Sequence, residues 1–286
     1  ILCYNTCTKI MELFIRQNND YDKNHVVTNQ KLGFCEGYNY TADCTNKNFQ
    51  RHFHDDYEIL FITEVTGEYT IENHKYNLMP YDLLLIKPTK YHYLQVKEHT
   101  HYGRFVFNIT PEFIRQDIID KAFSKGEFFH IGGASPITKN FLKLLDYNKV
   151  FDESEFTLQI KTILIENLLL ISKIDSNDNG ENYHYLDEFN TKVMQYIREN
   201  LTSITSLDQM AQDLYVSKST LYHSFKRVMK ISIMQYVRNK KVLNAHSLIK
   251  SGVRPTKAAV MSGFDDYTTF YRSYKLFFGH SPNESQ

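Results

Sequence analysis

Two segments in the last third of the chain repeat one plan, and this repeat constrains the fold more than any other feature. Each begins with a short amphipathic stretch that carries a small residue, Ala211 in the first copy and Ala259 in the second. A small side chain on the inner face allows a second helix to cross closely. A capping residue then opens the next helix, Ser217 in the first copy and Asp265 in the second. Each copy therefore predicts two short helices joined by a tight turn.

The second helix of each copy has an inward apolar face and an outward polar face. Leu221 and Phe225 face inward in the first copy, and Phe270 and Tyr274 in the second. The outward residues are Lys218, Ser219, Tyr222, His223 and Lys226, then Tyr267, Thr268, Tyr271, Arg272 and Lys275. Two such helices, separated by a predicted helix over 233–251, could occupy successive major grooves about 34 Å apart. The pattern predicts a module that reads double-stranded DNA.

At these residues the chain resembles the C-terminal domain of AraC/XylS-family transcriptional regulators. The matching positions are Ala211, Ser217, Leu221, Phe225-Lys226, Tyr236 and Ala245, then Gly263-Phe264, Phe270, Arg272, Lys275, Phe278-Gly279 and Ser281-Pro282. The chain departs from the family at Lys241, where arginine is usual, and at Pro255 and Ala258, where other apolar residues are usual. The resemblance implies a sequence-specific DNA-binding regulator. It favours an activator over a repressor and leaves contact with RNA polymerase open.

The resemblance also implies roles for the outward side chains. Base contacts are expected from Ser219, Tyr222, His223, Tyr267, Thr268, Tyr271 and Arg272. Arg272 is the main candidate, because arginine can pair bidentately with guanine. Phosphate contacts, which position a protein without reading sequence, are expected from Lys218, Lys226 and Lys275. The alternative for Tyr222 and Tyr271 is that they only pack at the protein surface.

The chain of 286 residues is long enough for two domains, and its charge is unevenly divided between them. Residues 186–286 carry 14 Lys and Arg against 8 Asp and Glu, whereas residues 1–185 carry 19 against 25. A basic C-terminal part is typical of a nucleic-acid-binding module. The polar segment 175–185 predicts a linker. We therefore expect an effector-binding and dimerisation domain over 1–174 and a DNA-binding domain over 186–286.

The N-terminal part predicts short strands at 58–65, 68–72, 82–86 and 104–108, with one or two more in 26–40. Their close spacing is typical of a β-barrel or sandwich, and the family resemblance favours a cupin-like barrel. Helical spacing follows at 113–123, 137–147 and 155–174, and the last helix is either core or a pairing surface. The expected fold class is α+β multidomain. A cupin-like β-barrel with dimerisation helices near 137–174 precedes an all-α double helix-turn-helix, and the protein is expected to be a homodimer.

By the alternation of extended backbone, the side chains of His52, His54 and Glu58 should point to one side, where His92 could join them. Three imidazoles and a carboxylate suit iron, manganese or zinc. The set resembles the two cupin motifs, although Tyr81 stands where glycine is usual. N-terminal domains of these regulators often keep such residues without a metal, as pocket lining. We therefore predict no metal, no cofactor and no enzymatic activity, with a metal-dependent sensor or enzyme as the rival hypothesis.

The interior of such a barrel could hold a small effector. The candidate lining residues are His52, His54, Tyr57, Glu58, Tyr69, His92, Tyr93 and Arg104. Their aromatic and polar character favours a small polar ligand such as a sugar or a related metabolite. A fatty acid would need a more apolar pocket with a basic anchor. A further alternative is a constitutive DNA-binding regulator whose barrel only pairs subunits.

The remaining features favour a cytoplasmic protein. Cys3, Cys7, Cys35 and Cys44 are expected to be reduced thiols, because the chain shows no secretion signal. Cys3 and Cys7 lack an obvious second pair with which to bind zinc. No apolar run approaches the roughly 18 residues that span a membrane. The expected partners are therefore double-stranded DNA, a small-molecule effector and a second copy of the chain, without a membrane.

Overall fold

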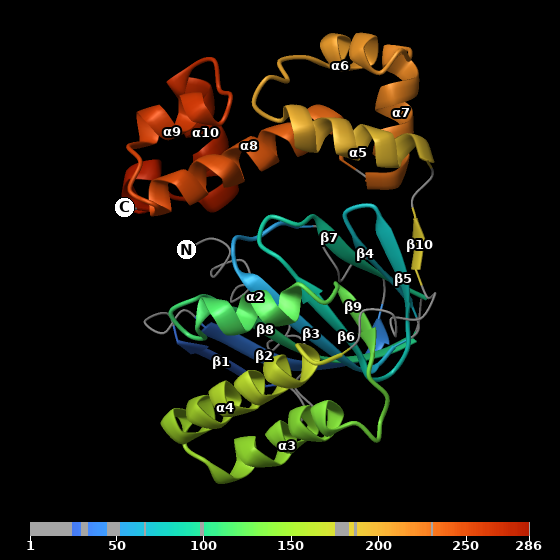
Figure 1. Ribbon diagram of the computed structural model, residues 1–286, viewed down its shortest axis with the longest axis vertical. Helices are drawn as coiled ribbons and strands as arrows, with labels where there is room; N and C mark the ends of the chain where they lie inside the picture. The colour runs from blue at the N-terminus through green and yellow to red at the C-terminus, as the bar shows by residue number, and fades with distance from the viewer. Residues whose placement is uncertain are drawn as a thin grey trace. The chain divides into compact units, whose positions relative to one another are not determined.

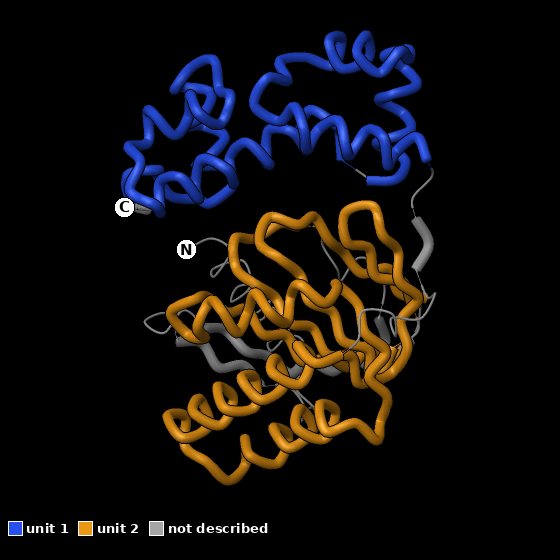
Figure 2. The backbone as a smooth tube through the Cα atoms, viewed as in Figure 1, with its two compact units in different colours: residues 1–10, 185–286 blue, residues 11–184 orange. Residues whose placement is uncertain are grey.

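The computed structural model describes residues 25–29, 34–44, 52–65, 67–97, 100–174, 183–185, 188–229 and 231–285. These residues form two compact units, one within residues 11–184 and the other within residues 185–286 (Figure 2). Cys3, Cys7 and most of the predicted linker, 175–182, lie outside the described residues. The last part of that predicted linker, Tyr183–Tyr185, forms a short strand, β10.

The strands of the first unit form two sheets (Figure 1). The larger has the order β1 (His25–Asn29), β2 (Phe34–Cys44), β8 (Thr100–Ile109), β3 (Tyr57–Glu64), β6 (Asp82–Ile86) and β9 (Phe128–His130). The smaller has the order β10, β5 (His74–Leu78), β4 (Gly67–Ile71) and β7 (His92–Val96). Among the described strands, pairing does not close these sheets into a barrel, so the closure predicted from the sequence is not confirmed.

The central strands of the larger sheet are buried on both faces. Along β3, Ile59 and Phe61 point to one face, and Leu60 and Ile62 point to the other, because successive side chains of a strand alternate. The face with Leu60 packs against the smaller sheet, and the face with Phe61 packs against helices. The unit therefore has three layers, which explains the continuous apolar runs that the sequence shows in β3 and β6.

Three helices form the outer layer of this unit, namely α2 (Gln116–Phe123), α3 (Pro136–Val150) and α4 (Glu153–Ile171) (Figure 1). Phe141 of α3 is fully buried and stacks on Phe61, with 4.6 Å between ring centroids. Helix α4 begins two residues before its predicted start. Asp152 caps it through a reciprocal pair of hydrogen bonds with Glu155.

The second unit is helical, with α5 (Glu188–Asn200), α6 (Leu207–Asp213), α7 (Lys218–Met229), α8 (Ile233–Lys250), α9 (Pro255–Met261), α10 (Tyr267–Phe278) and the short 3-10 helix η3 (Pro282–Ser285). Helix α8 agrees with the predicted helix over 233–251 to within one residue. Of the helices described in the whole chain, none combines the length and apolarity needed to cross a bilayer. The chain thus joins an N-terminal sheet unit to a C-terminal helical unit.

Several local predictions from the sequence are corrected by the structure. The cap of α10 is Asp266 rather than Asp265, because the Asp266 backbone is extended and its Oδ1 accepts from Thr269 N at 2.8 Å. Pro255 is the first residue of α9. A backbone N–H at this position has no partner within the helix, so its absence in proline costs no helical hydrogen bond. Strands β5, β7 and β9 were not predicted, because their short sequences mix charged or polar residues with aromatics and only pairing makes them strands.

Candidate functional site

Helices α6 and α7 have the predicted arrangement of cap and buried face. Ser217 Oγ accepts a hydrogen bond from Thr220 N at 3.0 Å, which satisfies a free N–H at the start of α7. Leu221 and Phe225 are fully buried beneath the helix. Tyr215, two residues before the cap, has a φ of 55° and is 95% exposed. The sequence analysis did not select this exposed aromatic side chain, because its turn conformation is unusual for a bulky residue.

The outward face of α7 carries the expected DNA-contacting residues, which are exposed or half-buried: Lys218, Ser219, Tyr222, His223 and Lys226. Lys226 Nζ donates a hydrogen bond to Tyr222 Oη at 2.9 Å, so these two side chains would approach DNA together. Lys218 forms an ion pair with Asp208 of α6, with 2.5 Å between Nζ and Oδ1. A phosphate at Lys218 would therefore have to compete with that carboxylate.

Helix α10, like α7, has a buried apolar face and an exposed polar face. Phe270, Tyr274 and Phe278 are buried. The outward residues are exposed, apart from the half-buried Tyr271: Tyr267, Thr268, Tyr271, Arg272 and Lys275. Hydrogen bonds from Thr269 chiefly hold the pKa of the Asp266 cap carboxyl below its usual range, and the charge of Arg272 adds to this effect. Arg272 thus lies on the exposed face of α10, within electrostatic reach of the Asp266 carboxylate.

A buried lysine connects the two helix pairs. Lys241 Nζ of α8 donates hydrogen bonds to the backbone oxygens of Ile204 and Gly263, both at 2.7 Å. We call these three residues the Lys241 clamp. Ile204 precedes α6 and Gly263 lies in the turn between α9 and α10, so one ammonium group joins the start of the first pair to the turn of the second. Burial lowers the pKa of Lys241, and the charge of Asp265 partly opposes this shift. The sequence analysis identified Lys241 only as a departure from arginine.

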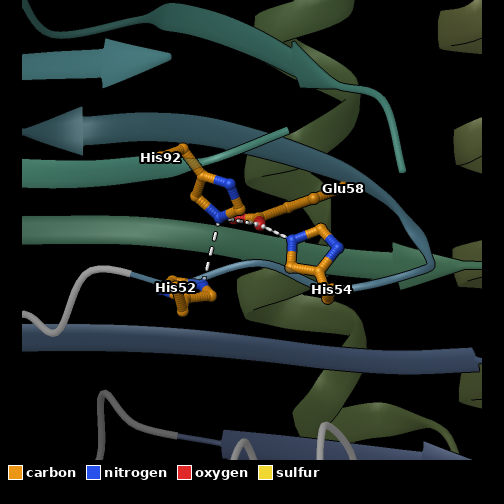
Figure 3. Close-up of side chains that lie close together, drawn as sticks. All are labelled: His52, His54, Glu58 and His92. Carbon is orange, nitrogen blue, oxygen red and sulfur yellow. Dashed lines mark hydrogen bonds and ion pairs between the residues drawn. The ribbon is translucent and has the colours of Figure 1, made fainter. Parts of the chain in front are cut away.

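In the sheet unit, His52, His54, Glu58 and His92 converge between the two sheets (Figure 3). We call them the inter-sheet cluster. Glu58 Oε2 lies 2.7 Å from His54 Nε2 and 3.2 Å from His92 Nε2. His92 Nε2 also lies 3.0 Å from His52 Nε2. Glu58 is on β3 and His92 on β7, and the backbones of His52 and His92 exchange two hydrogen bonds of 3.2 Å.

The inter-sheet cluster strongly favours positive charge beside Glu58. Burial acts to raise the pKa of the Glu58 carboxyl, but His92 and His54 outweigh it and hold that pKa well below its usual range. Burial likewise acts to lower the pKa of His54, but its hydrogen bond and ion pair with Glu58 outweigh burial and raise that pKa. The cluster can therefore bind protons, a cation or the positive end of a ligand.

Tyr69 and Arg104, two further predicted lining residues, face the same space. The Tyr69 ring stacks on His92 with 6.1 Å between centroids. Burial raises the pKa of Tyr69 well above its usual value, and the Glu58 charge adds to the increase. Arg104 pairs with Ile62 across β8 and β3, which places both side chains between the sheets. Its guanidinium lies 4.9 Å from the ring of Tyr102, an aromatic residue that the sequence analysis missed.

Tyr57 and Tyr93, the other two predicted lining residues, point away from this space. Tyr57 is partly buried against the helix layer, where its ring meets Phe123 edge-on at 5.0 Å. Tyr93 follows His92 on β7 and so faces the opposite side of the smaller sheet. Their placement follows from strand alternation, since each is the immediate neighbour of a residue in the inter-sheet cluster.

Comparison with known proteins matches both units. A model of an AraC-like ligand binding domain matches residues 36–165, and a model of a helix-turn-helix domain matches residues 210–286. The chain is 23% identical over 232 residues to an uncharacterized HTH-type transcriptional regulator, YbfI of Bacillus subtilis, across 77% of this chain and 80% of that protein. It is 21% identical over 239 residues to the Msm operon regulatory protein of Streptococcus mutans, across 80% and 84%. The solved structure of ToxT from Vibrio cholerae matches at 12% identity, across 88% of this chain and 97% of that chain, with a TM-score of 0.36.

Proposed function

This chain belongs to the AraC/XylS family of transcriptional regulators, and on that premise we propose how its two units act. The helical unit binds DNA, and the sheet unit is a ligand-binding domain. We assign sequence reading to α7 and α10, each of which enters a major groove with its polar face. The observation that carries this proposal is the repeat of one buried and one exposed face on both helices, within one compact unit.

Arg272 is the residue whose loss should change sequence preference most. Replacing Arg272 with alanine should relax the preference at one base pair and weaken binding to the preferred sequence by about 1–3 kcal/mol. The reason is that the bidentate contact of arginine with guanine discriminates among bases. The measurement is selection of a preferred site from random duplexes by the full-length protein, followed by titration of duplexes altered at each position.

Lys275→Ala is the matched control on the same helix. Because a phosphate contact carries no sequence information, this variant should weaken binding to every duplex alike and reduce its salt dependence. If Arg272→Ala behaves in the same uniform way, Arg272 is not a base reader. No binding by the parent protein at low salt would contradict DNA recognition itself.

For the sheet unit we propose a small polar effector, such as a sugar or a related metabolite. Tyr69, Arg104 and Glu58 offer donors and acceptors between the sheets, and Arg104 is half-buried rather than sealed. The ligand would act by binding more tightly to one of two states of the regulator. We propose that the regulator activates transcription. Separately, the two stacked sheets with their histidines support a cupin-like relationship.

Thermal unfolding of the full-length protein with a panel of sugars and fatty acids tests this assignment. A sugar at a hundredfold excess over its Kd should stabilise the folded state by about 2.7 kcal/mol. The same sugar should produce a smaller increase in Arg104→Met, whereas fatty acids should leave the transition temperature unchanged. A polar effector is contradicted if only fatty acids raise the transition temperature. It is also contradicted if no member of the panel raises it.

We further propose that α3 and α4 pair two subunits. Leu158 and Leu169 of α4 are 62% and 45% exposed, and the half-buried Ile165 lies between them at coiled-coil spacing. Such a face is typical of a helix that packs on a second copy. Sedimentation that finds only monomer at micromolar concentration contradicts this proposal. The dimer would act in the cytoplasm, where DNA and RNA polymerase are accessible.

A further inference from the structure

We propose that the inter-sheet cluster binds one divalent first-row transition-metal ion, with His52, His54, Glu58 and His92 as its ligands. One ligand atom from each residue lies within 4.8 Å of all the others. Three of the four residues are buried, and His52 is exposed at the edge of the cluster. This inference goes beyond DNA recognition and does not depend on it.

The backbone orients the imidazoles for binding through Nε2. His54 Nδ1 lies 2.9 Å from Asp56 O, and His92 Nδ1 lies 2.8 Å from Lys90 O. A carbonyl oxygen can only accept, so each Nδ1 carries the proton and donates it. This leaves Nε2 of both rings as the atom that faces Glu58 (Figure 3). Histidine ligands of metals are typically held by such a second hydrogen bond to a backbone carbonyl.

The ligand atoms of the cluster are electron-rich and lie close together. If His54 and His92 are neutral, with the proton on Nδ1, the lone pair of each Nε2 points at the Glu58 carboxylate or at another imidazole. These like-charged regions repel, most strongly where water is excluded. One dication gives all four ligand atoms a common partner.

The distances agree with this occupant. A metal about 2.0–2.2 Å from nitrogen and oxygen ligands leaves neighbouring ligand atoms roughly 3–4 Å apart. The three contacts within the cluster are 2.7, 3.0 and 3.2 Å. The four ligand atoms all lie within 4.8 Å of one another, so the ion would be admitted if the shortest contacts lengthened by a few tenths of an ångström and the widest separation shortened.

The ligand types define the class of metal. Three imidazole nitrogens and one carboxylate oxygen suit Zn²⁺, Fe²⁺, Co²⁺ or Ni²⁺. Mg²⁺ and Ca²⁺ prefer sites made of oxygen ligands, and Cu⁺ prefers thiolate or thioether ligands. The site would connect the segment that leads into β3 with the start of β7 on the other sheet, so occupancy should also stabilise the sheet unit.

Co²⁺ is a suitable probe, because its visible absorption reports coordination. The full-length protein, stripped with a chelator, should bind one equivalent of Co²⁺ and show a ligand-field spectrum. His52→Ala, which alters an exposed side chain, should lower the affinity at least tenfold. His101→Ala is the matched control: His101 also faces a carboxylate, with 3.1 Å between its Nδ1 and Glu64 Oε1, but it is exposed and lies outside the cluster. This control should bind Co²⁺ like the parent protein.

Two results would overturn the proposal. One is folded parent protein that fails to bind an equivalent of Co²⁺, and the other is equal affinity in the parent protein and His52→Ala. Should Glu58→Gln or His92→Ala not fold, X-ray absorption of the Co²⁺-loaded parent protein gives an independent answer. A shell containing several imidazoles supports the site, whereas a thiolate charge-transfer band or a shell without imidazole contradicts it. DNA titration of the same samples shows whether the helical unit is intact.

Discussion

Replacing Gly263 with alanine should destabilise the helical unit by roughly 2–5 kcal/mol, the sum of backbone strain and a steric clash. Gly263 has a φ of +82°, and a Cβ built there would lie 2.0 Å from the backbone oxygen of Thr202. Backbone atoms on both sides leave little freedom to relax. Thermal or urea unfolding of the full-length protein can be followed by far-ultraviolet circular dichroism. The helical signal of the variant should be lost at a lower temperature or urea concentration than that of the parent protein.

Gly252→Ala separates the two causes. Gly252 has a φ of +90°, but within the described part of the chain no atom lies within 4 Å of a Cβ built there. This variant should therefore suffer only the conformational strain, about 1–2 kcal/mol. If both variants are equally destabilised, close approach of Thr202 is not the reason for glycine at position 263.

Lys241→Met should have a comparable effect through the Lys241 clamp. Methionine keeps much of the side-chain volume but removes the donor, so the backbone oxygens of Ile204 and Gly263 lose a charged partner inside the unit. Each unpaired buried group costs about 1–3 kcal/mol, which predicts roughly 2–6 kcal/mol for the two oxygens together. DNA binding should weaken equally on all duplexes, because the clamp positions both helix pairs and reads no base.

Lys240→Met is the control on the same helix. Lys240 Nζ lies 5.5 Å from the centre of the Tyr236 ring, a contact worth about 0.5–1 kcal/mol at an exposed site. The double variant Gly263→Ala, Lys241→Met should be less destabilised than the sum of its parts, because both changes disturb the same peptide group. Full additivity, or a Lys241→Met protein as stable as Lys240→Met, contradicts a structural role for the clamp.

Local sequence was sufficient to predict the helices. Helix α7 starts at a serine cap and buries Leu221 and Phe225, and α10 buries Phe270 and Tyr274, as predicted. Such features depend on residues three or four positions apart. The error at Asp265 and Asp266 has the same origin, since two adjacent capping residues satisfy the pattern equally and only the backbone conformation selects one.

The sheet unit was predicted less completely. Alternation along β3 and β7 excludes Tyr57 and Tyr93 from the inter-sheet space, a conclusion that was accessible from their neighbours Glu58 and His92. Tyr102 could not be identified in this way, because its position beside Arg104 depends on how β8 lies between β2 and β3. The stacking of two sheets, which the described strands do not close into a barrel, also depends on pairing between distant strands.

The sequence by itself determined the family, the helical unit and the polar faces of α7 and α10, because periodicity, caps and turns act over a few residues. Only the tertiary structure decided that His92 meets His52 and His54 around Glu58, and that Lys241 binds two backbone oxygens. Residues as far apart as positions 52 and 92 are joined by strand register and layer packing. No short segment of the chain specifies such contacts, since they form only when the layers assemble.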